Sequence, residues 1–118
     1  MIFPALLLPA LLVPAAQRSE REIRFGRATE QFLEQDKTSP PPEEAILFIG
    51  SSIFRQWTDL REQMSPLPVF NRAFGGSRTW EVLHYMDRIV LPYKPRIIVY
   101  YCGSNDVNAG ARRQRNLR

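Results

Sequence analysis

The chain has 118 residues, of which 44% are hydrophobic and 24% charged, a balance typical of one soluble globular domain with a single core rather than a disordered chain. The formal net charge of +4 comes entirely from four arginines between positions 112 and 118. The other 114 residues carry twelve basic and twelve acidic side chains, so no nucleic-acid partner is expected.

Residues 1–16 are uncharged and rich in Leu, Ala and Pro. The segment is short for a membrane span but suits the apolar core of a secretory signal peptide, with cleavage near Ala15 or Ala16, so no stable membrane insertion is expected. No basic residue precedes it, and prolines at every fifth position would interrupt a helix, so the alternative is a disordered apolar tail or a misplaced start codon. The expected location is secreted or periplasmic with a signal peptide and cytoplasmic without one.

Residues 17–44 predict a surface helix followed by a proline-rich lead-in. Between positions 17 and 37 the chain is charged and has a thin apolar stripe near helical spacing, formed by Ile23, Ala28, Phe32 and Leu33. The prolines at 40–42 end any helix, because proline lacks the amide donor and restrains its predecessor to extended geometry. The sheet is expected to begin just after them.

Residues 45–110 predict a partial α/β domain. Apolar runs at 45–49 and 96–101, each followed by a glycine, indicate buried parallel strands, and 67–70 predicts a shorter third strand. Residues 79–91 carry apolar side chains at helical spacing, namely Val82, Leu83, Met86, Ile89 and Val90. Helices alternating with strands favour a parallel sheet with right-handed crossovers and ligands at the carboxyl ends of the strands. Three strands are few, so the sheet looks unfinished.

Two features near the C-terminus have mainly structural interpretations. Cys102 is the sole cysteine, which excludes an intrachain disulfide, and its place beside an apolar run favours a buried structural thiol over a reactive one. Residues 111–118 form a basic tail without interleaved aromatic residues. A solvated tail is favoured over a phosphate-binding run or a frameshifted terminus.

Three polar blocks follow the apolar runs, and the first contains a candidate nucleophile. Ser52 lies two residues past Gly50, where a turn from strand to helix would hold its hydroxyl at the mouth of the sheet. Ile53 and Phe54 would pack that helix on the sheet. The alternative is that Ser51 or Ser52 only caps the helix, as serine often does.

The second and third blocks contain candidate donors to an oxyanion. Gly75 and Gly76 precede a helix, where bare amides can approach an anion, although two glycines are also ordinary turn residues. Asn105 and Asp106 follow the last strand, and a carboxamide there can stabilise an oxyanion, although both residue types are also common in caps and turns. Each block alone is weak evidence of catalysis.

Together, in this order, the blocks resemble the SGNH hydrolase family, the GDSL-like lipases and esterases, over roughly residues 45–110. The family's serine block is matched by residues 50–53, its glycine block by residues 71–77 and its asparagine block by residues 103–106. Three blocks in order are far more specific than any one of them.

The resemblance implies a flavodoxin-like three-layer α/β/α fold, incomplete in this chain. It also implies a serine ester hydrolase that acts on small acyl esters, such as acetylated sugars or lipids, without a metal or other cofactor. Ser52 would be the nucleophile. The amides of Ser52 and Gly76, with the side chain of Asn105, would form the oxyanion hole, where each donor typically contributes a hundredfold to a thousandfold in turnover.

The sequence departs from the family pattern at two places. Ser51 stands where the family's name motif has Asp, a position that need not carry the chemistry. The family's final block, an Asp followed three residues later by the catalytic His, is absent, and the sole histidine, His84, falls in the predicted helix as a surface or partly buried residue without a family role. Without a base serine is a poor nucleophile, so the chain is expected to be inactive as written or truncated before that block. The alternatives are a non-catalytic carbohydrate- or acyl-binding module and a nonfunctional gene fragment.

The first two blocks are flanked by Arg55, Trp57 and Arg72. These residues, or Arg78, could line a substrate pocket. More often such residues are a packed aromatic and solvated charges, so no substrate contact is assigned, and the oligomeric state is left open.

Overall fold

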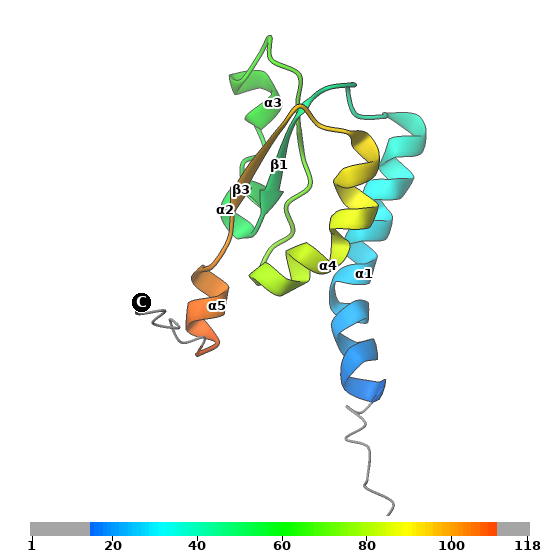
Figure 1. Ribbon diagram of the computed structural model, residues 1–118. Coiled ribbons are helices and arrows are strands. Elements are labelled where there is room, and N and C mark those ends of the chain that lie inside the picture. The colour runs from blue at the N-terminus through cyan, green and yellow to red at the C-terminus, as the bar shows by residue number, and fades with distance from the viewer. Residues whose placement is uncertain (1–14, 111–118) are drawn as a thin grey trace, which may run out of the picture.

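The computed structural model describes residues 15–110, with side chains from residue 25 onward. The expected signal peptide at 1–16 falls outside the described residues except for its last two positions, and the basic tail at 111–118 falls outside them entirely. The described part is an α/β fold with a small parallel sheet, as the sequence predicts (Figure 1).

The described elements follow the predicted order, with additional short helices. In chain order they are α1 (Ala15–Thr38), β1 (Ile46–Gly50), α2 (Ser52–Arg55), α3 (Leu60–Gln63), β2 (Val69–Asn71), α4 (Thr79–Ile89), the 3-10 helix η1 (Leu91–Tyr93), β3 (Ile97–Tyr101) and α5 (Ser104–Asn108). The strands begin and end within two residues of the predicted limits. The segment between β1 and β2 forms two single-turn helices, and α5 was not among the predicted elements.

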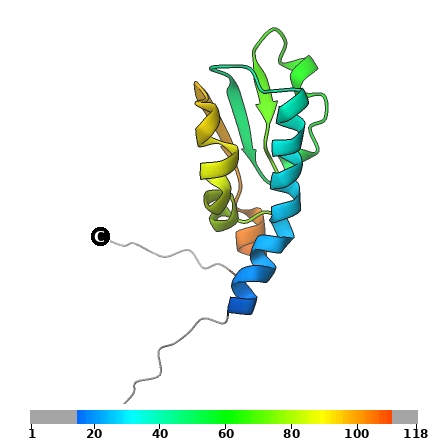
Figure 2. The same cartoon turned by 90° about the vertical axis from the view of Figure 1, so that its right-hand side faces the viewer.

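The three strands form one parallel sheet in the order β2-β1-β3, so β1 is central. Phe48 of β1 lies opposite Asn71 of β2 and Val99 of β3. Helices cover both faces of the sheet: α1 and α4 lie side by side on one face, and α2 and α3 lie on the other (Figures 1 and 2). The carboxyl ends of all three strands therefore meet at one edge of the sheet.

Strand β1 is buried on both faces, which explains its unbroken apolar run. Leu47 and Ile49 belong to a core formed with α1 and α4, whereas Phe48 belongs to a smaller core on the other face. There the ring of Phe48 meets the ring of Phe54 edge-on, with 5.2 Å between centroids. The prediction that Ile53 also packs α2 on the sheet is wrong, because its side chain points into solvent and is exposed.

Helix α1 packs through a face that differs from the predicted stripe. Phe25 and Thr29 are buried, and Ala28 and Phe32 are partly buried against the same core, whereas the side chain of Ile23 is not among those described. A hydroxyl is tolerated in this core because Thr29 donates a hydrogen bond of 2.8 Å to the carbonyl of its own helix one turn earlier. The helix therefore contributes one large aromatic side chain, Phe25, that the predicted stripe omits.

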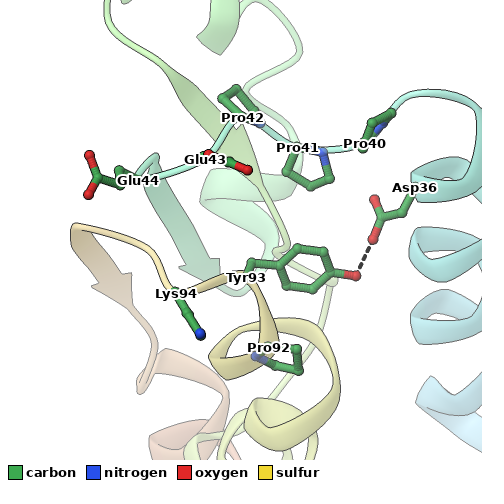
Figure 3. A pocket seen from close by; sticks show the side chains of 9 residues that line it. All are labelled: Asp36, Pro40, Pro41, Pro42, Glu43, Glu44, Pro92, Tyr93 and Lys94. Atoms are coloured by element: carbon green, nitrogen blue, oxygen red, sulfur yellow. Dashed lines mark hydrogen bonds between the residues drawn. The ribbon is translucent and has the colours of Figure 1, made fainter.

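A buried ion pair fastens the end of α1 to the segment after β2. The guanidinium of Arg72, only 4% exposed, donates to both carboxylate oxygens of Asp36 at 2.5 Å. Its Cζ lies 4.8 Å from the ring centroid of Tyr93 and 5.1 Å from those of Phe32 and Phe70. The Tyr93 hydroxyl also donates to Asp36 (Figure 3), and burial, followed by this hydrogen bond, raises the pKa of Tyr93. The expectation of a solvated charge at Arg72 is therefore wrong.

Helix α4 turns a slightly different face to the core than its spacing predicts. Val82, Tyr85 and Ile89 are buried, whereas Leu83 is 71% exposed. The buried face is centred on the contact of Tyr85 with the ring of Phe74, with 5.9 Å between centroids. Leu83 is therefore an apolar side chain left outside the core.

Strand β3 is less buried than predicted. Ile97, Ile98, Tyr100 and Tyr101 are each between 43% and 48% exposed. The strand pairs only with β1 in the part of the chain that the structure describes, and of its five side chains only Val99 packs against a core. An apolar run of this kind predicts burial on both sides, but burial requires neighbours that the run itself cannot specify.

Candidate functional site

The three polar blocks meet at the carboxyl edge of the sheet, where hydrogen bonds join them. Ser77 donates its hydroxyl to the carbonyl of Gly50 at 3.1 Å, and the amide of Ser51 donates to the carbonyl of Tyr101 at 3.1 Å. The Nδ2 of Asn105 donates to the carbonyl of Ser77 at 2.9 Å. These hydrogen bonds therefore join three segments that lie more than twenty residues apart in sequence, although Ser51 and Ser77 are themselves buried.

Gly50 occupies a position that only glycine allows. Its φ is 152°, and a Cβ at this residue would lie 1.9 Å from the carbonyl oxygen of Tyr101. The carbonyl of Gly50 also accepts a hydrogen bond from the amide of Phe74 at 3.1 Å. Close backbone approach at this glycine is what brings the first block against the other two.

Ser52, the predicted nucleophile, is the first residue of α2 and is half-buried. Its hydroxyl makes no hydrogen bond to any group between residues 25 and 110, while its carbonyl accepts from the amide of Gln56 at 2.9 Å. The backbone amide of Ser52, at the first position of α2, also has no acceptor within the helix. Ser52 therefore offers an unengaged hydroxyl at the mouth of the sheet.

Ser51 precedes α2 as its N-cap residue but makes no side-chain capping hydrogen bond. It is 1% exposed, and its Oγ has no hydrogen-bond partner among the described residues. The capping alternative for Ser51 is therefore not realised by its side chain.

The orphaned hydroxyl of Ser51 gives a stability prediction. Ser51→Ala removes a buried polar atom that nothing satisfies, so we expect the free energy of unfolding in urea to rise by about 1 kcal/mol. Thr29→Val is the control, because it removes a buried hydroxyl that does have a hydrogen-bond partner. We expect it to lower the free energy of unfolding by about 1 kcal/mol. Equal losses in the two variants would contradict the prediction.

Gly76 lies in the turn between β2 and α4, with a φ of 78° in the left-handed region that favours glycine. The preceding Gly75 lies against the side chain of Arg55, whose Cδ would be 3.2 Å from a Cβ at that glycine. Arg55, expected as a solvated charge, is exposed and extends from α2 over this turn. Both ordinary turn geometry and close approach to a ligand are compatible with Gly76.

Asn105 lies in the first turn of α5 and binds the residue next to Gly76. Its Nδ2 carries two N–H donors, and the second has no acceptor among the described residues. The structure thus brings Asn105 and the Gly76 turn together directly. The first block is joined to them through the backbone of Gly50 and Ser51, and α2 is joined to the second block by a hydrogen bond from the Nδ2 of Asn71 to the carbonyl of Phe54 at 2.6 Å.

Asp106 acts as a cap, but of a helix other than its own. Its carboxylate accepts from the backbone amide of Thr79 at 3.0 and 3.1 Å and from the Thr79 hydroxyl at 3.2 Å, at the first residue of α4. A carboxylate at this end of a helix is favourable. Tyr100 donates to the same hydroxyl at 3.3 Å, and burial raises the pKa of Tyr100. A contact across 27 positions leaves no signal in local sequence spacing.

Two further titratable residues take structural positions. Cys102 is half-buried, packs against the larger core and lies 3.3 Å from the carbonyl of Ser77 through its Sγ, in keeping with a structural thiol. His84, the sole histidine of the sequence, is exposed on α4 with its ring edge-on to Tyr85, 4.8 Å between centroids. Within residues 25–110, His84 makes no hydrogen bond to Ser52, so it does not serve as its base in this structure.

Trp57 is a packed aromatic, as expected. Its ring meets Phe48 edge-on with 5.9 Å between centroids, and its indole nitrogen donates to the side chain of Gln63 at 2.8 Å. The side chain holds α2 and α3 against the sheet and adds no group to the mouth.

The cavity drawn in Figure 3 lies away from the candidate site. It has a volume of 610 Å³ and is lined by Asp36, Pro40, Pro41, Pro42, Glu43, Glu44, Pro92, Tyr93 and Lys94. These residues come mostly from the segments that precede β1 and β3, so the cavity opens at the amino edge of the sheet.

Comparisons with protein-family models, with curated proteins and with solved structures found no match. Between residues 25 and 110, no group of three or more His, Cys, Asp or Glu side chains is placed to hold a metal ion. No helix in that range is long and apolar enough to cross a membrane. The class of structure is therefore described by its geometry alone. It is a small parallel α/β sheet with a serine, a glycine turn and an asparagine at its carboxyl edge.

Proposed function

We propose that this chain carries the acyl-binding site of a serine ester hydrolase of the SGNH type on a flavodoxin-like sheet. The observation that carries the proposal is the joining of three turns by hydrogen bonds, with Asn105 bound beside Gly76 and the unengaged hydroxyl of Ser52 at the start of α2. Carboxyl edges of parallel sheets are the usual ligand sites of such folds. The substrate class is small acyl esters, such as acetylated sugars or lipids.

In the proposed reaction, the Oγ of Ser52 attacks the acyl carbon. The ester C–O bond then breaks, the alcohol leaves with a proton, and water releases the acid from the acyl-enzyme. The oxyanion formed at the acyl carbon accepts hydrogen bonds from the amides of Ser52 and Gly76 and from the second N–H of Asn105. Because no histidine takes the serine proton, solvent water must accept it.

The missing base sets the expected rate. The sequence contains no Asp-x-x-His, and His84 is exposed on α4. Loss of one member of a catalytic triad lowers turnover by roughly 10⁴ to 10⁶. We therefore expect slow acylation by activated esters and very little turnover of ordinary ones.

A fluorophosphonate probe tests the assignment of the nucleophile. We expect slow, saturable labelling of the full chain and loss of that labelling in Ser52→Ala. Ser104→Ala, which changes an exposed serine of the third block, is the matched control and should label like the unmodified chain. Labelling that persists in Ser52→Ala would remove Ser52 as the nucleophile.

The second candidate is a non-catalytic module that holds an acyl or carbohydrate group at the same edge. It is favoured by the absence of the base from the sequence. An NMR titration with triacetin separates the two functions. Saturable shifts of the Gly76 and Asn105 amides without release of acetate would support the binding module, whereas release that depends on Ser52 would support the hydrolase.

A further inference from the structure

Strand β3 presents an unusual surface for the edge of a sheet. Its five residues, Ile97–Tyr101, contain no charge and no proline, and four of them are almost half exposed. The edge away from β1 has no partner strand in the part of the chain that the structure describes. Edge strands are ordinarily protected by a charge, a proline, a bulge or a covering segment. β3 carries neither a charge nor a proline, and no described strand pairs with its outer edge.

An apolar groove runs beside this strand on the face that carries α4. It has a volume of 320 Å³ and is lined mainly by Ile98 and Tyr100 of β3 and by Val82, Leu83 and Met86 of α4. Leu83, the helix residue left outside the core, stands on its wall with 71% of its surface exposed. The open edge and the groove thus form one continuous apolar surface.

We propose that this surface binds a second copy of the chain, with the two β3 strands paired antiparallel about a two-fold axis at Val99. The pairing joins two three-stranded sheets into one of six strands. Ile97 of each copy then lies opposite Tyr101 of the other, and Ile98 lies opposite Tyr100. Pairs of an aromatic and a β-branched residue are among the favourable cross-strand neighbours.

The self-complementarity of β3 is the reason for choosing a second copy as the occupant. The sequence Ile-Ile-Val-Tyr-Tyr places the two isoleucines and the two tyrosines symmetrically about Val99. An antiparallel pair therefore matches Ile with Tyr at every flanking position, as an isologous interface requires. No charged side chain lies within the paired segment, so like charges do not oppose the contact.

The groove extends the same interface. A two-fold axis perpendicular to the sheet keeps both α4 helices on one face, so that the two grooves face each other and Leu83 of one copy can enter the groove of the other. Complete burial of the exposed parts of Leu83 and the β3 side chains would give an interface of at most about 1,000 Å² over the two copies. That area is at the lower limit for a specific interface, so the expected dimer is reversible.

Sedimentation velocity of the full chain over a range of concentrations tests the proposal. We expect a reversible equilibrium between monomer and dimer, and at least a tenfold weaker dimer for Ile98→Lys, because a charge opposes pairing at an edge. Leu67→Lys is the matched control, since Leu67 is similarly exposed at 48% but precedes β2 on the far side of the sheet. A chain that stays monomeric, that forms only large aggregates, or whose dimer is unaffected by Ile98→Lys would overturn the proposal.

Cysteine cross-linking tests the register. In a Cys102→Ser background, Val99→Cys places two thiols opposite each other across the axis, at a Cα separation of about 5 Å that a disulfide can span. Ile97→Cys in the same background is the control, because its two copies would lie roughly 13 Å apart along the strands. Rapid dimer formation by Val99→Cys and not by Ile97→Cys is the expected result. Cross-linking by neither variant, or equally by both, would overturn the antiparallel pairing.

Discussion

Gly50→Ala is expected to abolish cooperative folding of the chain. A Cβ at this position would lie 1.9 Å from the carbonyl oxygen of Tyr101, a backbone atom of β3 that cannot turn aside as a side chain would. The backbone φ of 152° is also one that side-chain-bearing residues rarely adopt. Relief requires that β1 and β3 separate at the carboxyl edge, which would also break the hydrogen bond from Ser51 to Tyr101. We expect a loss of roughly 4 kcal/mol or more, comparable to the whole stability of a small domain.

Thermal unfolding followed by circular dichroism measures this effect, and the chain supplies its own control. Gly26 lies within α1, and a Cβ at that position would meet nothing within 4 Å. Gly26→Ala is therefore expected to raise stability by roughly 0.5–1 kcal/mol, because alanine is the better helix former. A cooperative transition in Gly50→Ala near that of the unmodified chain would contradict the proposed role of close strand approach.

Arg72→Met is expected to lower the free energy of unfolding by about 3–5 kcal/mol. The substitution keeps much of the side-chain volume between the aromatic rings but leaves the carboxylate of Asp36 without its cation in a largely buried place. The remaining hydrogen bond from Tyr93 does not replace a charge. Arg72→Lys is expected to be intermediate, because an ammonium keeps the charge but neither the flat stacking nor the paired donors.

Urea unfolding of Arg72→Met should be compared with Arg88→Met. Arg88 of α4 likewise forms an ion pair with a carboxylate of α1, that of Glu30 at 2.5 Å. The side chain of Arg88 is 47% exposed, however, and that of Glu30 is 60% exposed. Solvent-exposed pairs contribute about 0–1 kcal/mol, so the Arg88 variant should lose little. Losses of the same size in both variants would show that burial of the Arg72 pair contributes nothing extra.

The parallel sheet and the place of the three polar blocks could be predicted from the sequence because both depend on local patterns. The apolar run at 45–49 ends in a glycine and is buried on both faces, and the blocks follow the strands as the pattern indicates. Parallel strands then force the blocks to one edge whatever the rest of the chain does. The general position of Ser52, Gly76 and Asn105 follows from that rule alone.

The contacts that could not be predicted are those between distant residues. Neither the pairing of Arg72 with Asp36 nor the binding of Asp106 at Thr79 leaves a trace in spacing, because each joins segments at least 27 positions apart. The exposure of β3 could not be predicted for a related reason: the run of apolar residues is typical of a buried strand, but its burial depends on which neighbours are present. Phe25, which is buried in the larger core, lies off the apolar stripe that the spacing of Ile23, Ala28 and Phe32 predicts.

The order β2-β1-β3 also has a consequence for synthesis of the chain. The central strand β1 is made first, but its partner β3 follows about fifty positions later, since Ile46 pairs with Ile97. While translation proceeds, one side of β1 can pair with β2 and the other stays open as an uncharged edge. Non-local pairing of this kind is slow and leaves intermediates prone to association.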